Sequence, residues 1–158
     1  MKRTARDILR EKNGDMLTVD MEATVHQAVT IMTRHRVGAI LIVDAGRIVG
    51  IWTERDLLRR TLDPQFDPRT ERVSQSMTRA LISANVDEQV MQLYDKFLGR
   101  RIRHLLIEEN GEYVGLLSAG DVMRASLQQR AEEYRALNEM VSLEYYENWK
   151  THQEEALR

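Results

Sequence analysis

The chain of 158 residues contains no cysteine, which excludes disulfide bonds, a thiolate nucleophile and cysteine-ligated metal sites. It also lacks a basic excess, because 23 Lys and Arg against 25 Asp and Glu leave a net charge of −2, so we expect no nucleic-acid partner. No apolar run approaches the roughly 20 residues that span a bilayer, and no apolar segment follows Met1. We therefore expect a cytoplasmic protein with no signal peptide and no membrane contact.

Proline is also scarce, and the two prolines both fall in residues 63–69. We interpret this segment as a linker between a first unit, residues 1–62, and a second unit, residues 70–126. The last segment, residues 127–158, contains neither glycine nor proline and is predicted to be a helical extension. The composition, 42% apolar and 30% charged, is that of a globular protein.

The two units repeat one another at an offset of 65 residues, so that Leu41-Ile42 meets Leu106-Ile107 and Gly46 meets Gly111. In each unit a short strand precedes apolar residues at helical spacing, and a continuous apolar run typical of a buried strand follows them. A turn then leads to a return strand and a helix. Both units therefore predict the order strand, helix, strand, strand and helix, which is an α/β (α+β) fold.

Each unit ends in the same motif: a glycine, two apolar residues, a hydroxyl residue, two variable positions and an aspartate. The first copy is Gly50 to Asp56 and the second is Gly115 to Asp121. The hydroxyl residues, Thr53 and Ser118, stand where a helix N-cap belongs, and each aspartate lies in the first helical turn. Such a corner offers a hydroxyl, a carboxylate and free backbone N–H groups to a ligand. Alternatively, each aspartate only stabilises the positive end of its helix.

Two such units, each ending in this motif, resemble the CBS domain family, in which a tandem pair is called a Bateman module. The resemblance covers about residues 4 to 126. It implies two repeats packed around a pseudo-twofold axis, with an adenosine compound in the cleft between them. AMP or ATP is the first expectation for the ligand, and NAD or S-adenosylmethionine is also possible. The resemblance further implies a homodimer.

The resemblance also assigns the ligand contacts. Asp56 and Asp121 would accept hydrogen bonds from ribose hydroxyls, and Thr53 and Ser118 match the hydroxyl that contacts phosphates. Arg103-His104 resembles a basic pair that reaches phosphates, and Arg55 is a further phosphate candidate. The adenine would lie against the first strands and the starts of the second strands, which contain Thr18, Val19, Gly38, Ala39, Ile40, Ser83, Arg103, His104 and Leu105.

Several of these residues also have a purely structural interpretation. Arg103 and His104 suit a solvated strand edge, and Arg55 suits the surface of a helix. Trp52 is a candidate for adenine stacking, but its alternation with Ile51 favours packing or a dimer contact. The histidines show no metal-ligand spacing, so we expect no metal site.

No nucleophile with a neighbouring base and no phosphate-binding loop with a lysine stands out, so we expect no catalytic activity. The first hypothesis is a sensor that binds an adenine nucleotide and signals to a regulated partner protein through a conformational change. The second is a ligand-free dimerisation scaffold that acts through its C-terminal helix. A third is an RNA contact through Arg100-Arg101-Ile102-Arg103, which the acidic balance of the chain disfavours.

The helical extension carries one apolar stripe: Leu127, Ala131, Tyr134, Leu137, Val141 and Tyr145. A helix of this length is marginally stable in water unless it packs against something. We therefore expect it to dock on its own core or on a partner chain.

Overall fold

The computed structural model describes residues 2–12 and 16–156, with side chains as far as residue 142. The first part of the chain forms α1 (Ala5–Lys12), β1 (Thr18–Asp20), α2 (Val25–His35), β2 (Ala39–Asp44), β3 (Arg47–Thr53) and α3 (Glu54–Arg60). The second part forms the 3₁₀ turn η1 (Val73–Gln75), β4 (Ser83–Asn85), α4 (Val90–Arg100), β5 (His104–Glu109), β6 (Glu112–Ser118) and α5 (Ala119–Ala156).

The repeat predicted from the sequence is confirmed in the secondary structure. From β1 to the start of α3, each element begins 65 residues before its counterpart in the second half. Each half contains a three-stranded sheet, in which the middle strand is parallel to the first and antiparallel to the third. The two hairpins turn through glycines at positive φ, Gly46 at 78° and Gly111 at 83°, a conformation that costs glycine little. The predicted fold class is therefore correct.

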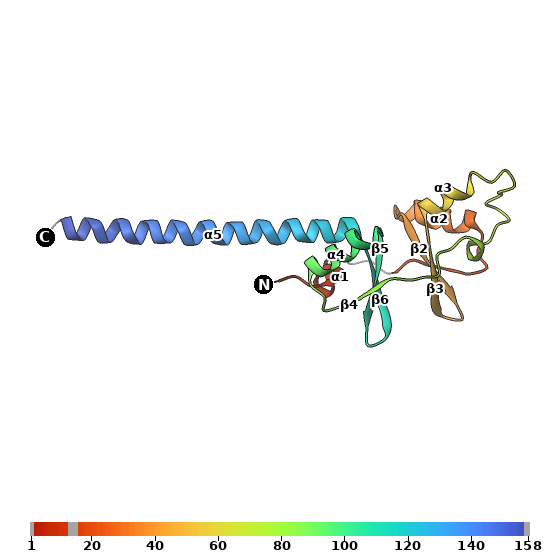
Figure 1. The fold of residues 1–158 in the computed structure, drawn as a ribbon, viewed down its shortest axis with the longest axis horizontal. Helices are drawn as coiled ribbons and strands as arrows, with labels where there is room; N and C mark the ends of the chain where they lie inside the picture. Colours follow the sequence, from red (N-terminus) through yellow and green to blue (C-terminus); the bar gives the residue numbers. More distant parts are fainter. Residues whose placement is uncertain (1, 13–15, 157–158) are drawn as a thin grey trace.

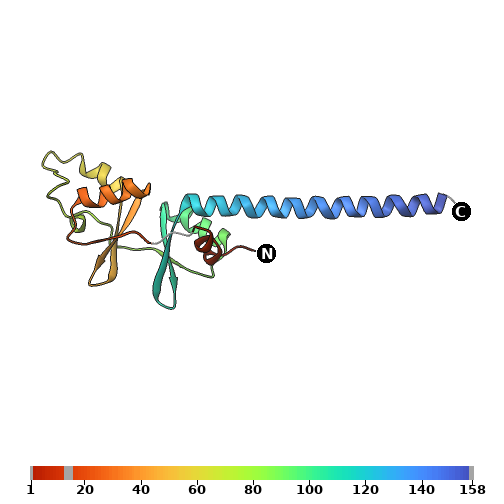
Figure 2. The ribbon, with the colours of Figure 1, turned by 180° about the vertical axis from the view of Figure 1, so that it is seen from behind.

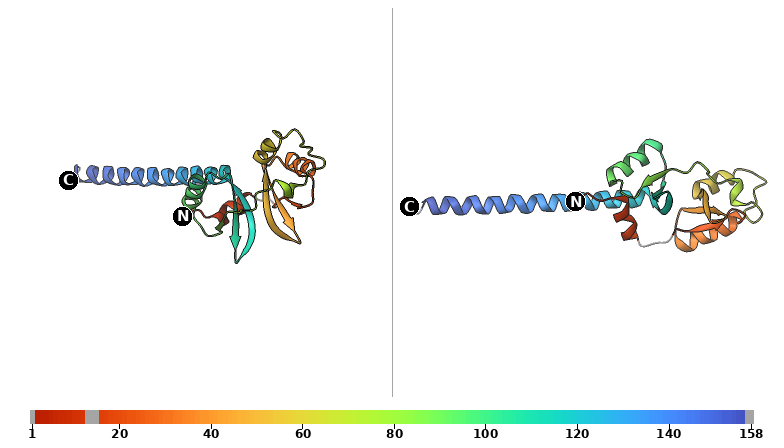
Figure 3. Two further views of the ribbon diagram at one scale, coloured as in Figure 1. Left: turned by 45° about the vertical axis from the view of Figure 1, so that its right-hand side comes forward. Right: turned by 90° about the horizontal axis from the view of Figure 1, so that it is seen from below.

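The middle strand of each sheet is buried on both faces, as its continuous apolar sequence predicts. In β2, Ile40 and Ile42 are fully buried in the first core with Trp52 of β3. Leu41 points to the other face by alternation and is also fully buried. Figures 1 and 3 show that the two sheets lie next to each other, with the helices on their outer sides. The end of β3 and the start of β5 line one cavity between the halves.

Each core contains a segment from the other part of the chain. Ile8 of α1 lies in the second core, and the Arg6 N–H donates to the Val86 carbonyl at 2.8 Å. Val73 of η1 is fully buried in the first core, and its N–H donates to the Ala23 carbonyl at 2.9 Å. The boundaries at residues 62 and 70 stay a prediction about the repeats along the chain. The packing units differ from those repeats, because α1 and η1 are exchanged between the halves.

The exchange explains why both corner motifs begin with glycine. A Cβ atom at Gly115 would lie 2.4 Å from a methyl carbon of Leu9 on α1. A Cβ atom at Gly50 would lie 2.4 Å from the sulfur of Met77, which follows η1. Cβ atoms essentially never show contacts this short, so a side chain at either position would force Leu9 or Met77 to move, and glycine allows the exchanged segment to approach the sheet closely.

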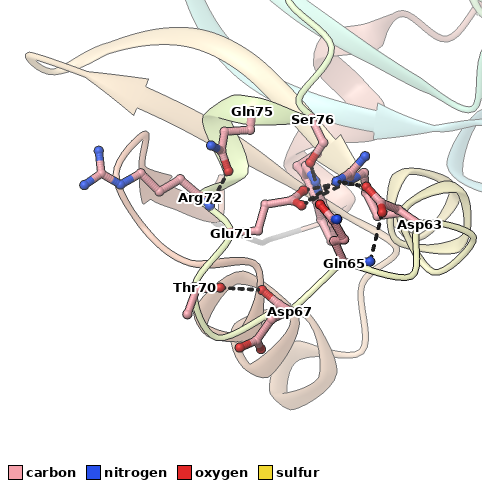
Figure 4. A network of polar contacts seen from close by, with 10 residues as sticks. Asp63, Gln65, Asp67, Thr70, Glu71, Arg72, Gln75 and Ser76 are labelled. Carbon is pink, nitrogen blue, oxygen red and sulfur yellow. Dashed lines mark hydrogen bonds and ion pairs between the residues drawn. The ribbon is translucent and has the colours of Figure 1, made fainter.

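The proline-containing segment, interpreted above as a linker, is fixed onto the first half by polar contacts (Figure 4). Arg60 donates to the carboxylate of Glu71 through Nε at 2.9 Å and through Nη2 at 2.7 Å, and to Asp63 at 3.1 Å. The Arg60 guanidinium also lies 5.7 Å from the centre of the Phe66 ring, within the range of a cation–π contact. Ser76 accepts a hydrogen bond from Nε1 of Trp52 at 3.1 Å.

The long C-terminal helix is confirmed as α5, and its first turns pack against the rest of the chain. Val122 and Ala125 belong to the second core, while Figures 1 and 2 show the later part of α5 extending away from both halves. Of the expected apolar stripe, Leu127, Tyr134, Leu137 and Val141 are exposed, and the side chain at 145 lies outside the described side chains. None of the described helices combines the length and the apolar character needed to cross a lipid bilayer.

Candidate functional site

A cavity of about 180 Å³ lies between the two halves, at the corner that ends the first repeat. It is lined by Gly38, just before β2, by residues of β3 and α3, by Thr78 after η1, and by residues of the second half around the start of β5. Six of the residues predicted to bind a ligand line this cavity: Gly38, Thr53, Arg55, Asp56, Arg103 and His104. The fold therefore brings together residues that are up to 66 positions apart in the sequence.

The corner holds Asp56 in a fixed position. Its Oδ2 atom accepts hydrogen bonds from the N–H of Thr53 at 2.9 Å and from the Thr53 hydroxyl at 2.8 Å. The residue is 6% exposed, and its Oδ1 atom lies 3.7 Å from Arg59. The structural interpretation of Asp56 is thus partly correct, because one oxygen stabilises the start of α3. The other oxygen leaves an acceptor available to a ligand.

The cavity is rich in arginine. Four arginines line it, against the two carboxylates of Glu54 and Asp56. Arg55 and Arg103 were predicted, and the structure adds Arg59, one turn further along α3, and Arg101, which caps α4 in the left-handed conformation at φ 51°. The sequence could have indicated Arg59, because it follows Asp56 by three residues and so lies on the same face of the helix. Arg101 belongs to the basic run from Arg100 to Arg103 noted in the sequence, but its place at this cavity depends on the packing of the two halves.

The cavity is also lined by Thr78, which is bonded to β3 through its backbone, and by two apolar side chains. Thr78 reaches it because Thr78 and Ile51 exchange two backbone hydrogen bonds of 2.9 and 3.0 Å. Ile51 and Ile102 line the cavity from opposite halves. These apolar groups beside cationic ones suit a ligand that has an apolar ring and a charged end.

His104 lines the cavity and also feels the charges of the second corner. Burial lowers the pKa of His104 below its usual 6.5, and the positive charges of Lys12 and Arg103 lower it further, against the opposing effect of Asp121. The imidazole is therefore neutral near pH 7. In that state one ring nitrogen can donate a hydrogen bond to a ligand and the other can accept one.

The second corner repeats the bonding of the first but has an additional partner. The Oδ2 atom of Asp121 accepts from the N–H and the hydroxyl of Ser118, both at 2.8 Å, and from Nζ of Lys12 at 2.9 Å. Burial acts to raise the pKa of Asp121, but the hydrogen bonds from Lys12 and Ser118 outweigh it, so the pKa falls below its usual 3.8. The two predicted corners are therefore not equivalent.

The other predicted residues lie outside the cavity. Ile40 and Leu105 are fully buried in the two cores, and Ala39 is 4% exposed. Thr18 and Val19 line a shallow groove between β1 and α2, and the Ser83 hydroxyl donates to Glu108 at 3.3 Å. Ala39 and Leu105 directly follow the cavity residues Gly38 and His104 in the chain, so sequence position alone did not separate them, whereas Thr18, Val19 and Ser83 lie in β1 and β4, which do not line the cavity.

Two further interpretations concern aromatic and metal chemistry. Trp52 is fully buried in the first core, which confirms packing over adenine stacking. Within residues 2–12 and 16–142, no group of three or more His, Asp and Glu side chains lies close enough to hold a metal ion.

Comparison with known proteins gives the class of the molecule. The family model described as "CBS domain" matches residues 5–63 and 72–128, so this chain belongs to the CBS domain family and contains two CBS domains. It is 32% identical, over 144 residues, to the mitochondrial CBS domain-containing protein CBSX3 of Arabidopsis thaliana, covering 85% of this chain and 70% of that protein.

Solved structures agree with this assignment. The CBS-domain protein ATU1752 of Agrobacterium tumefaciens matches with a TM-score of 0.74 and 32% identity, covering 78% of this chain and 99% of the other. The CBS domain pair of MJ0100, solved in complex with 5′-methylthioadenosine and S-adenosyl-L-methionine, matches in fold with a TM-score of 0.70 and 23% identity, covering 82% and 99%.

Proposed function

We propose that the protein is a non-catalytic sensor that binds an adenine nucleotide in the cavity between its two CBS domains. The observation that carries this proposal is the cavity itself, which combines a fixed carboxylate with four arginines from both halves. The free oxygen of Asp56 suits the adjacent hydroxyls of a ribose. The arginines suit phosphate groups, which they bind through several N–H donors at once.

The charge of the cavity favours ligands that carry phosphate. Four arginines against two carboxylates give an excess of positive charge, which attracts AMP, ATP or NAD and disfavours the cationic sulfonium group of S-adenosylmethionine. MJ0100 is similar in fold and was solved with two adenosine compounds, and the adenosine group is common to all of these ligands. AMP and ATP are therefore our first choices.

Because the cavity takes residues from both halves, a bound ligand would tie the halves together. A ligand that prefers one packing of the halves shifts the population toward that packing. The start of α5 belongs to the second core, so this helix is the element through which the change would reach a partner protein. We further propose that the chain works as a homodimer in the cytoplasm and regulates another protein.

The test is a titration of the full chain with AMP, ATP, NAD and S-adenosylmethionine by isothermal calorimetry. Asp56→Asn and Arg103→Gln each remove one charged contact, and a hydrogen bond to a charged group contributes about 1.5–3 kcal/mol. We therefore expect each variant to bind about 10- to 100-fold more weakly. Arg47→Gln, at an exposed hairpin position, is the matched control and should bind like the wild type. Equal affinity in all three variants would contradict the proposed site.

The exposed face of α5 favours a second candidate, a scaffold that binds no ligand. Its apolar residues Leu127, Tyr134 and Leu137 are between 55% and 66% exposed, which suits contact with another chain. Truncation after Arg130 discriminates the two, because it keeps the hydrogen bonds of Gln128 and Gln129 to Arg3. A sensor should still bind nucleotide after truncation, whereas a scaffold should lose its assembly and show no nucleotide binding in either form.

A further inference from the structure

Lys12 is the last residue of α1, and its side chain reaches the second corner. Its Nζ atom donates to Oδ2 of Asp121 at 2.9 Å and to the carbonyl oxygen of Leu116 at 2.9 Å. The Lys12 side chain is 37% exposed and the Asp121 side chain 15% exposed. The ammonium group therefore adds a third hydrogen bond to the oxygen that already accepts from Ser118, while Oδ1 of Asp121 lies 3.9 Å from Arg124.

The first corner has no such partner. Among the described residues, the groups bonded or paired to Asp56 are Thr53, in the same corner, and Arg59, one turn along the same helix at 3.7 Å. No segment from the other half donates to Asp56 in the part of the chain that the structure describes. The two carboxylates, equivalent by the repeat, thus differ in whether the protein itself supplies a cationic partner from outside the corner.

We propose that Lys12 determines how many nucleotides the chain binds. Its ammonium group gives the Asp121 carboxylate a charge-assisted bond that no other described segment gives Asp56. Ribose hydroxyls therefore bind at Asp56 and not at Asp121, so the chain binds one nucleotide and not two. This inference rests on the proposed function of the first corner.

The reason is the strength of the bond that a ligand would have to replace. A charge-assisted hydrogen bond is roughly twice as strong as a bond between neutral groups, so a ribose hydroxyl exchanges poorly for an ammonium group. Lys12 is also held in place by its helix, because α1 packs on the second core through Ile8 and approaches Gly115 through Leu9. Displacing Lys12 would therefore disturb a packed element as well as an ion pair.

The second corner also has fewer positive charges than the first, which supports a single nucleotide site. The position of Arg55 in the first repeat is Gly120 in the second, and the position of Arg103 corresponds to Gly38. The groove beside Asp121 is lined by one arginine, Arg124, in addition to Lys12. The second corner thus offers fewer cations to phosphates.

The experiment is a calorimetric titration with AMP of the wild type, Lys12→Met and Lys12→Arg. Methionine keeps the apolar stem and removes the charge, and arginine keeps the charge and serves as the matched control. We expect one binding event in the wild type and in Lys12→Arg, and two in Lys12→Met. The second event should be weaker than the first and should disappear in the double variant Lys12→Met with Asp121→Asn.

A second measurement does not depend on Lys12 variants being well folded. In the wild-type background, Asp121→Asn should leave the affinity for AMP unchanged, while Asp56→Asn should weaken it. Two events in the wild type, a single event in Lys12→Met, or equal losses in the two aspartate variants would each overturn this inference alone. No binding of AMP to any form would remove the proposed function, and the inference with it.

Discussion

Gly50 tests the link between the exchanged segment and the cavity, and Gly50→Ala is the perturbation. A Cβ atom at this position would lie 2.4 Å from the sulfur of Met77, 3.0 Å from its Cγ atom and 3.2 Å from the carbonyl oxygen of Thr78. The methionine side chain can move, but the Thr78 carbonyl is backbone. Thr78 is also fixed to Ile51 by two hydrogen bonds of 2.9 and 3.0 Å.

The expected cost follows from these contacts. Overpacking a well-filled site typically costs about 1–3 kcal/mol, and weakening the two backbone hydrogen bonds adds to it at about 1 kcal/mol each. We expect the free energy of unfolding to fall by about 2–4 kcal/mol. For a chain of this size, 1 kcal/mol corresponds to roughly 2–4 °C in the midpoint of unfolding, so the midpoint should fall by roughly 4–16 °C.

The assay is urea and thermal unfolding followed by circular dichroism, with Gly99→Ala as the matched control. Gly99 lies in α4, and a Cβ atom added there would meet no other atom within 4 Å, so alanine should stabilise the helix by up to about 1 kcal/mol. The same substitution should therefore have opposite signs at the two positions. Because Thr78 lines the cavity, Gly50→Ala should also weaken AMP binding. Wild-type stability in Gly50→Ala would refute the reasoning.

Two further predictions concern pH and the shared core. The pKa of His104 is lowered in the folded state, so the unfolded chain binds a proton more readily, and stability that is present above the usual pKa of 6.5 is lost as the pH falls through 6.5 toward the folded pKa. His104→Gln should reduce this loss in urea unfolding at about pH 5.5 and 7.5, on either side of the usual pKa, and an unaltered pH dependence would contradict the pKa shift. Val73→Ala removes fully buried methyl groups from the first core and should lower the free energy of unfolding by about 2 kcal/mol. Leu58→Ala, at a side chain that is 70% exposed, should change it little, and equal effects of the two substitutions would show that η1 is not part of the core.

The sequence by itself determined the repeat, the order of the elements and the two corners. These features depend on local chemistry: the period of apolar residues selects helix or strand, positive-φ glycines fix the hairpins, and a hydroxyl followed by an aspartate starts a helix. Because the halves repeat at an offset of 65 residues, the elements predicted for one half also predicted those of the other. A pattern within each repeat contains no information about what packs against it, so the sequence did not show that Lys12 pairs with Asp121.

Only the tertiary structure decided which of the predicted residues line the cavity. It placed Ile40 and Leu105 in the cores, and it brought Arg101 to the cavity from the other half. It also exchanged α1 and η1 between the halves, which set Lys12 against Asp121 and left Asp56 without such a partner among the described residues. These outcomes depend on contacts between segments that are far apart in the chain. Their energies come from burial and ion pairing across the fold, which no local pattern records.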